Sequence, residues 1–125
     1  MNRKQMLERL NELGFDKADY WLVAGSAMVL YGLRAETGDI DMGCAPRLSK
    51  KLQAQGCPVD YMPDGTKHIV LAEDVELFEN WLYDRVEMVD GFPAISLQGL
   101  IEMKKRIGRE KDLRDIALIE QYLKG

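Results

Sequence analysis

The sequence has few of the residues that build thiolate metal sites or disulfide frameworks. Its 125 residues include only two cysteines, Cys44 and Cys57, with no Cys-x-x-Cys spacing, and one histidine, His68. A structural zinc site needs a cluster of Cys and His ligands, which this composition excludes. No Cys–His pair is spaced for nucleophilic catalysis. We interpret both thiols as reduced and mostly buried, and His68 as structural or exposed.

Long apolar runs and an excess of positive charge are also missing. No stretch approaches the length of a membrane span, and the N-terminal MNRKQMLERL lacks the hydrophobic core of a signal peptide. The sequence therefore predicts a cytoplasmic protein with no membrane contact. Seventeen Lys and Arg against 21 Asp and Glu give a net charge of -4, which argues against non-specific nucleic-acid binding but allows a local basic groove.

What the sequence does contain is enough apolar residues, 46%, for the core of a single domain over residues 1–125. Helical periodicity, caps and turn residues predict an α/β (α+β) fold, with a small mixed sheet flanked by helices and a helical C-terminus. Ser26 and Ser96 are the predicted N-caps of two helices. The helices are predicted over 2–13, 26–33, 46–56, 97–108 and 111–123, the last with Leu113, Ile116, Ala117 and Tyr122 facing the core. The strands are predicted over 20–25, 39–44, 57–63, 67–72 and 75–82, which ends in a turn of helix, and as a hairpin over 85–96 that turns at Asp90-Gly91.

The stretch ETGDIDMG, residues 36–43, places two aspartates one residue apart on a predicted strand. Side chains alternate between the faces of a strand, so Asp39 and Asp41 point the same way while Ile40 points into the core. Parallel carboxylates repel each other and are tolerated beside a turn, water or a cation. Such a pair also suits an ordinary strand edge, where charge discourages aggregation.

Gly25 and Ser26 lie where the preceding strand gives way to a helix. Glycine lets the backbone approach a ligand closely, amide groups at a helix start attract phosphate, and Ser26 adds a hydroxyl, although it also suits a plain helix cap. Twelve residues separate Ser26 from Asp39, enough for a helix and a return loop. The carboxylates would then lie near a phosphate cradle, an arrangement that suits a nucleoside triphosphate with two Mg²⁺ ions.

Two blocks resemble a known family. VAGSAMVLYGLRAETGDIDM resembles the signature of the DNA polymerase β-type nucleotidyltransferase superfamily, and is similar to its small abortive-infection toxin-type and aminoglycoside or lincosamide members. SLQGLIEMKKRIGREKDLRDIALI resembles the C-terminal element of the same small enzymes. The resemblance implies a nucleotidyltransferase fold and the Mg²⁺-dependent transfer of a nucleoside monophosphate from an NTP to an acceptor hydroxyl, carried by a small molecule, a protein side chain or an RNA end.

The same resemblance assigns roles to individual residues. Asp39 and Asp41 would be metal ligands, and Gly25 and Ser26 would contact the triphosphate. The third carboxylate of the family would be Glu76, in VEL, in preference to Asp60, in VDY; aspartate is the usual residue there. Lys104 would reach the phosphates, with Lys105 as the alternative. The base that helps to deprotonate the acceptor would be the third carboxylate or Asp112.

Several of these residues have plainer explanations. Arg34 and Thr37 either contact phosphate or hold their loop by hydrogen bonds. The seven acidic residues between Glu73 and Asp90 and the six basic residues of 102–114 suit solvated surfaces. The alternative function is an inactive nucleotidyltransferase-like binding module, such as a toxin–antitoxin partner. A homodimer or a partner chain is a further expectation, because 125 residues leave little room for an acceptor-recognition domain.

Overall fold

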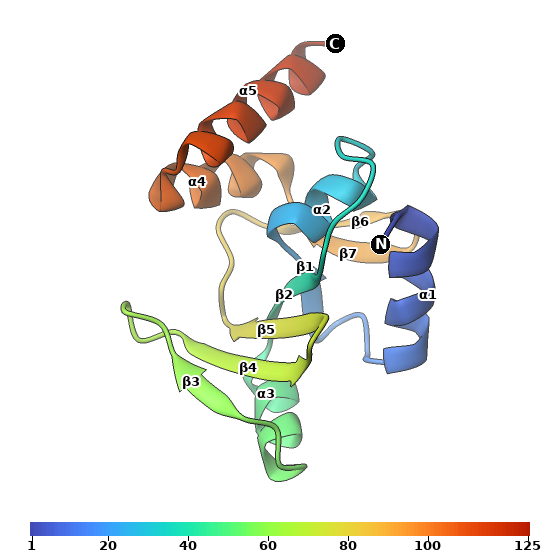
Figure 1. The fold of residues 1–125 in the computed structure, drawn as a ribbon, viewed down its shortest axis with the longest axis vertical. Coiled ribbons are helices and arrows are strands. Elements are labelled where there is room, and N and C mark those ends of the chain that lie inside the picture. The colour runs from blue at the N-terminus through green and yellow to red at the C-terminus, as the bar shows by residue number, and fades with distance from the viewer.

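A seven-stranded mixed sheet organises the chain, which the computed structural model describes over residues 1–125 (Figure 1). Its strands lie in the order β3-β4-β5-β2-β1-β7-β6. The central pairs β2–β5 and β1–β7 are parallel, and the other four pairs are antiparallel. The strands are β1 (Tyr20–Leu22), β2 (Ile40–Cys44), β3 (Val59–Tyr61), β4 (Lys67–Ala72), β5 (Val75–Glu79), β6 (Val86–Val89) and β7 (Phe92–Ile95).

Five helices accompany the sheet, so the predicted mixed α/β class is confirmed. They are α1 (Arg3–Leu13), α2 (Ala24–Leu30), α3 (Pro46–Ala54), α4 (Leu97–Ile107) and α5 (Glu110–Lys124). Figure 1 shows α5 on α4, and α4 beside α2, whereas α3 lies against β4 and β5 at the other end of the molecule. None of the helices is both long and apolar enough to cross a bilayer.

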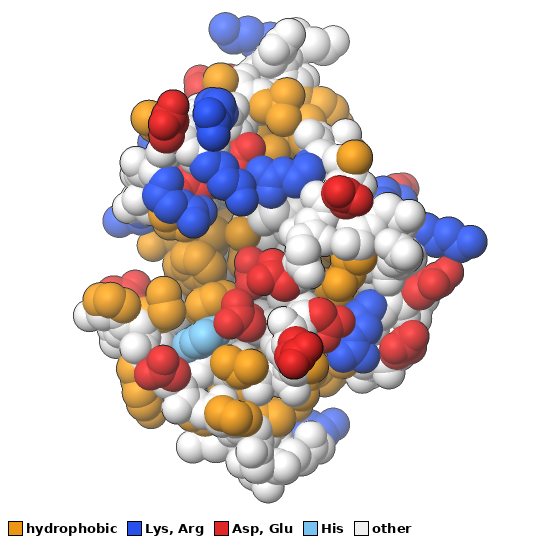
Figure 2. Space-filling model, viewed as in Figure 1, with side chains coloured by type: hydrophobic (Ala, Val, Ile, Leu, Met, Phe, Trp, Pro, Cys, Tyr) orange, Lys and Arg blue, Asp and Glu red, His pale blue; other side chains and the backbone are white.

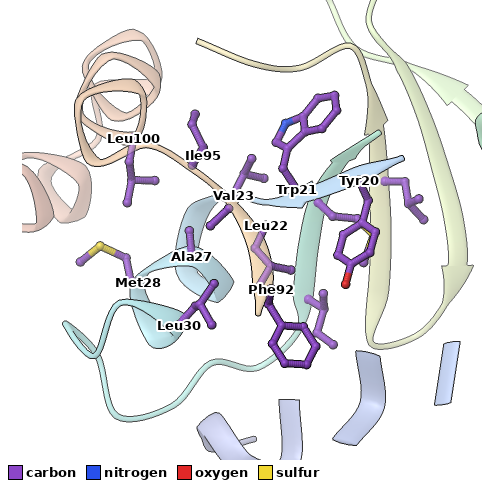
Figure 3. Packing of buried hydrophobic residues seen from close by; sticks show 14 of the residues in the cluster. Tyr20, Trp21, Leu22, Val23, Ala27, Met28, Leu30, Phe92, Ile95 and Leu100 are labelled. Carbon is purple, nitrogen blue, oxygen red and sulfur yellow. The ribbon is translucent and has the colours of Figure 1, made fainter. Parts of the chain in front are cut away.

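The hydrophobic core joins the central strands to α2 and α4. Figure 3 shows Met28 of α2 beside Leu100 of α4, with Ile95 of β7 and Leu22 of β1 nearby. All four side chains are fully buried. Burying a side chain of this size contributes about 1.5–3 kcal/mol, so this packing fixes the position of α2 against the central strands.

Most predicted elements are found within two or three residues of their expected ends. Ser96 caps α4 as predicted, since its hydroxyl accepts a hydrogen bond from the Gly99 amide at 3.0 Å. The hairpin β6–β7 turns at Asp90 and Gly91, both with positive φ, as predicted. Asn2 caps α1 through a reciprocal pair of hydrogen bonds with Gln5.

The predicted start of α2 is wrong. The helix begins at Ala24, with Val23 as its N-cap, so Ser26 is the third helical residue. The Val23 amide donates to the carbonyl of Asp41 at 3.0 Å, which continues the pairing of β1 with β2 past the end of the strand. Ala24 then turns the chain with φ of +52°, a value that residues with a side chain rarely adopt. The turn is therefore tighter than the sequence pattern indicates.

The turn of helix predicted after β5 is absent, because residues 80–85 are irregular. The Asn80 amide donates to the Cys44 carbonyl at 2.8 Å, and the Trp81 carbonyl accepts a hydrogen bond from the Trp21 indole at 2.8 Å. These bonds tie the segment to β1 and β2 instead of to itself.

The predicted core face of the last helix is also largely wrong. Leu113 and Tyr122 are 58% and 52% exposed, and of the four predicted residues only Ile116 is buried. Asp112 and Asp115 share the buried face of α5 with Ile116 and Ile119. The reason is electrostatic: both carboxylates turn inward to pair with Lys104 of α4.

Gly43 of β2 provides a test of the packing. A Cβ there would collide with the Trp21 indole and lie 2.7 Å from the Trp81 carbonyl oxygen. We expect Gly43→Ala to lower the free energy of unfolding by about 1–3 kcal/mol, because an overpacked core must shift its backbone. Urea denaturation measures the change. The control Gly38→Ala places its Cβ in open space and is expected to have little effect; equal losses in both variants would contradict this account.

Candidate active site

Three carboxylates from β2, β5 and the residue before β2 converge on one face of the sheet. Asp39, Asp41 and Glu76 each offer an oxygen, and these oxygens lie within 4.8 Å of one another. Asp41 and Glu76 are direct partners in the parallel pairing of β2 with β5, so their side chains leave the sheet on the same face. Asp39 lies two residues before Asp41 and shares that face. We call these three residues the acidic triad.

Of the two candidate carboxylates, Glu76 is the one that lies beside Asp39 and Asp41. Glu76 is in the triad, whereas Asp60 lies on β3, with β4 between it and β5, and is exposed to solvent. Parallel pairing brings Glu76 next to Asp41 directly, without any intervening loop.

The close approach of like charges shifts the acidity of Asp41. Burial, followed by the charges of Asp39 and Glu76, raises the pKa of the Asp41 carboxyl from 3.8 to about 7. No Lys or Arg forms an ion pair with any member of the triad; the only partner is His68, whose Nε2 lies 3.1 Å from Glu76. The triad therefore carries a concentration of negative charge, which the more distant charge of Lys111 offsets only in part.

A cavity of about 230 Å³ opens beside Asp39 and Asp41. Four of its lining residues are cationic, and the rest come mainly from the β1–α2 turn and the segment before β2. The lining residues are Ala24, Gly25, Arg34, Thr37, Asp39, Asp41, Lys104, Arg109 and Lys111. We call this the cationic cavity. Figure 2 shows Lys and Arg side chains gathered in a band, with a group of Asp and Glu side chains below it.

Gly25 lines the cavity, and two side chains lie directly over its backbone. A Cβ at this position would be 2.8 Å from Arg34 Nη1 and 3.0 Å from Thr37 Oγ1. The Thr37 hydroxyl donates to the carbonyl of Asp39 at 3.1 Å, which holds the loop before β2. The absence of a side chain at Gly25 thus lets Arg34 and Thr37 reach the cavity.

Ser26 does not present its hydroxyl to the cavity. The residue is fully buried, and its Oγ lies 2.7 Å from both the Val23 and the Asp41 carbonyl oxygens, to which it donates. The predicted contact between this hydroxyl and a triphosphate does not fit that position. Instead, Ser26 links the β1–α2 turn to the strand that carries the carboxylates.

Two cations of the cavity are held by one buried carboxylate. Asp115 of α5 accepts from Arg34 Nη2 at 2.7 Å and from Lys104 Nζ at 2.9 Å. Lys104 is only 3% exposed but lines the cavity, whereas Lys105 is exposed and pairs with Glu102. The sequence left open which of the two lysines faces the site, and the structure places Lys104 there. The pKa of the Asp115 carboxyl is lowered: burial raises it, but the bonds from Lys104 and Arg34 outweigh that effect.

Asp112 has a structural position that does not suit the predicted role of base. It is fully buried and accepts from Arg109 Nε at 2.7 Å and Nη2 at 3.2 Å, and from the Arg109 amide at 3.1 Å. These bonds, the Arg109 side chain first, lower the pKa of the Asp112 carboxyl. A carboxylate without solvent access and with a lowered pKa is a poor acceptor for the proton of an external hydroxyl.

A second hollow of about 370 Å³ shares no lining residue with the cationic cavity. Its walls come from the turn after β3, the segment after β5 and α4. The lining residues are Met62, Pro63, Asp64, Trp81, Tyr83, Met103, Arg106 and Ile107. We call this the aromatic groove. Figure 2 shows hydrophobic side chains flooring a hollow between the basic band and the acidic group.

Arg109, Lys111 and Asp115 belong to the C-terminal block of the sequence, but sequence reasoning gave Arg109 and Lys111 no role of their own, and it missed His68 as the neighbour of Glu76. The basic run of 102–114 was the available signal, but the sequence does not show which of its side chains face the cavity. Comparison with known proteins adds no further assignment, since no family model and no curated protein matches the chain. The chemistry of the site therefore rests on its geometry.

The raised pKa of Asp41 makes the stability of the metal-free protein depend on pH. Between the unfolded value of 3.8 and the folded value of about 7, the folded chain keeps a proton that the unfolded chain releases. The free energy of unfolding therefore falls as the pH rises through this window. Asp41→Asn removes the effect, so we expect it to raise the melting temperature by about 5 °C at about pH 8 and by less at about pH 5.

Calorimetry in the presence of a chelator measures the melting temperatures of the wild type and of Asp41→Asn at both pH values. The control is Asp60→Asn, which changes an exposed carboxylate outside the triad. A gain for Asp41→Asn that is equal at both pH values would show that the proton of Asp41 is not its cause.

We expect Asp115 to be essential for stability because its carboxylate forms ion pairs with both Arg34 and Lys104. Asp115→Ala leaves buried Lys104 with only Asp112, whose oxygen is 3.7 Å away. Removing one partner of a buried ion pair is expected to cost about 3 kcal/mol, measured by urea denaturation. The matched control on the same helix is Glu110→Ala, whose exposed pair with Arg114 contributes less than about 0.5 kcal/mol. Similar small losses in the two variants would contradict the account.

Proposed function

We propose that the protein is a Mg²⁺-dependent nucleotidyltransferase with a nucleotidyltransferase fold. It transfers a nucleoside monophosphate from an NTP to an acceptor hydroxyl and releases pyrophosphate. The observation that carries the proposal is the position of the acidic triad at the edge of the cationic cavity. The order of Gly25, the paired aspartates and the basic C-terminal segment, which motivated the resemblance in the sequence, supports the same function.

The triad fits a divalent cation by its chemistry. Carboxylate oxygens are the ligands that Mg²⁺ and Mn²⁺ prefer, and the three oxygens lie within 4.8 Å of one another without an ion pair to any Lys or Arg. Asp39, Asp41 and Glu76 would hold the metal. When bound, two Mg²⁺ ions would supply charge stabilisation for the attacking and leaving oxygens of the phosphoryl group.

The cationic cavity is the proposed site for the β- and γ-phosphates. Arg34 and Lys104 are fixed by Asp115, and Arg109 by Asp112, so these cations face the cavity with little freedom to reorient. Lys111 adds a fourth positive charge and acts electrostatically on Asp41. Preorganised charges of this kind stabilise the negative charge that develops on departing pyrophosphate.

The acceptor is proposed to approach from the aromatic groove. In-line displacement requires the attacking hydroxyl opposite the leaving pyrophosphate. The aromatic groove shares no lining residue with the cationic cavity, so an acceptor in the groove leaves the cavity free for the phosphates. Glu76 is connected to the groove wall through His68, Phe78 and Trp81. With Asp112 buried, Glu76 is the proposed acceptor for the proton of the hydroxyl.

An inactive binding module would be favoured by a third carboxylate far from Asp39 and Asp41, so the proximity of Glu76 to both supports the enzyme instead. Such a module gains nothing from keeping three carboxylates together, because their repulsion lowers stability. The proposal specifies the acceptor only as a hydroxyl. Whether a small molecule, a protein side chain or an RNA end carries that hydroxyl is not part of the proposal.

The proposal predicts that NTPs stabilise the protein only when Mg²⁺ is present. A ligand at about 100 times its Kd stabilises the folded state by about 2.7 kcal/mol, which thermal denaturation detects. In the Asp39→Ala/Asp41→Ala double variant we expect no such stabilisation, and pyrophosphate release lower by at least about 100-fold, because metal and phosphate positioning are lost together.

The matched control is Asp60→Ala, which removes a nearby carboxylate that does not belong to the triad. It is expected to behave as the wild type. Wild-type protein that is not stabilised by any of the common NTPs with Mg²⁺ would overturn the proposed function.

A further inference from the structure

Glu76 differs from the other members of the triad in length. Its side chain has one more rotatable bond than an aspartate, so holding its carboxylate in one position costs more conformational entropy. The shorter side chains of Asp39 and Asp41 keep their carboxylates close to the backbone. A glutamate in the third position therefore needs a partner that fixes its end.

His68 of β4 is placed to be that partner. Its Nε2 lies 3.1 Å from Glu76 Oε1, across the antiparallel pairing of β4 with β5. In that pairing His68 is opposite Phe78 and Val70 is opposite Glu76, so the two side chains are diagonal neighbours on one face. His68 is the one residue outside the triad that bonds to any of its side chains.

The imidazole ring is itself held in place. It stacks on Phe78 with the ring centres 4.8 Å apart and the planes inclined by 14°, and Phe78 in turn contacts Trp81 at 4.7 Å. The His68 side chain is 16% exposed, against 33% for Glu76. A ring fixed on an aromatic platform presents Nε2 to Glu76 in a defined direction.

The direction of the hydrogen bond follows from the chemistry of its partners. An ionised carboxylate only accepts hydrogen bonds, so Nε2 of His68 carries the hydrogen and donates it to Oε1. One oxygen of Glu76 is then occupied by the ring, and the other stays available to bind a cation. The bond thus sets the orientation of the carboxylate without neutralising it.

We propose that His68 is a positioning residue that orients Glu76 for metal binding. This role rests on the proposed function, because it requires the triad to hold a divalent cation. Hydrogen-bond partners of metal ligands typically contribute about 10-fold to metal affinity. The role also explains how a glutamate serves where the resembling enzymes have the shorter aspartate.

The test measures Mn²⁺ affinity of the intact protein without nucleotide, by calorimetry or electron paramagnetic resonance. His68→Phe keeps a ring on Phe78 but removes the donor, and we expect about 10-fold weaker binding. His68→Gln returns an N–H donor at a similar reach and is expected to restore most of the affinity. The control Lys67→Gln removes a cation on the same strand that pairs with Glu79, outside the triad, and is expected to bind as the wild type.

A double-mutant cycle separates orientation of Glu76 from a general effect on the fold. Glu76→Asp shortens the side chain so that its carboxylate no longer reaches His68. In that background we expect His68→Phe to change Mn²⁺ affinity by less than about 2-fold, because the interaction it would remove is already lost. Circular dichroism and melting temperature verify that every variant is folded.

Each outcome decides the proposal. Wild-type affinity in His68→Phe, no recovery in His68→Gln, or the same loss in the wild-type and the Glu76→Asp backgrounds would overturn the role of His68 alone. Failure of the wild type to bind Mn²⁺ would overturn the metal site itself, and with it the proposed function.

Discussion

The parallel pairing of β2 with β5 is the constraint on which the site depends. It places Asp41 beside Glu76 in register, and the two-residue repeat of a strand adds Asp39 on the same face. Burial, together with repulsion among the carboxylates, raises the pKa of Asp41 and opposes this arrangement. The pairing persists because the opposite face of the same strands buries Ile40, Met42 and Leu77 in the core. The folding energy of the core thus offsets the electrostatic cost of the triad.

The two signs of charge are kept separate by dedicated partners. Asp112 and Asp115 of α5 bind Arg109, Arg34 and Lys104, so these cations do not collapse onto the triad a short distance away. The cavity consequently brings four cations close to the carboxylates of Asp39 and Asp41 without an ion pair between the two groups. A metal-bound polyphosphate has the complementary distribution, with cations toward the carboxylates and phosphates toward the basic side chains.

The same site is extended by aromatic contacts. His68, Phe78 and Trp81 form a continuous series from the carboxylate of Glu76 to the wall of the aromatic groove. The Trp81 carbonyl accepts a hydrogen bond from the Trp21 indole, and both groups pack closely against Gly43. Core packing, orientation of a triad residue and the shape of the groove are therefore parts of one structure, and a change in one is transmitted to the others.

The sequence by itself determined the features that arise from local physics: the helix and strand periods, the cap at Ser96, the turn at Asp90-Gly91, and two aspartates on one strand face. It also indicated Glu76 and Lys104 through a resemblance. Only the tertiary structure decided that Glu76 lies in the triad, that Ser26 and Asp112 are buried, that α5 turns its carboxylates inward, and that His68 reaches Glu76. These depend on which strands pair and on charges brought together from distant segments, and one-dimensional patterns do not contain that information.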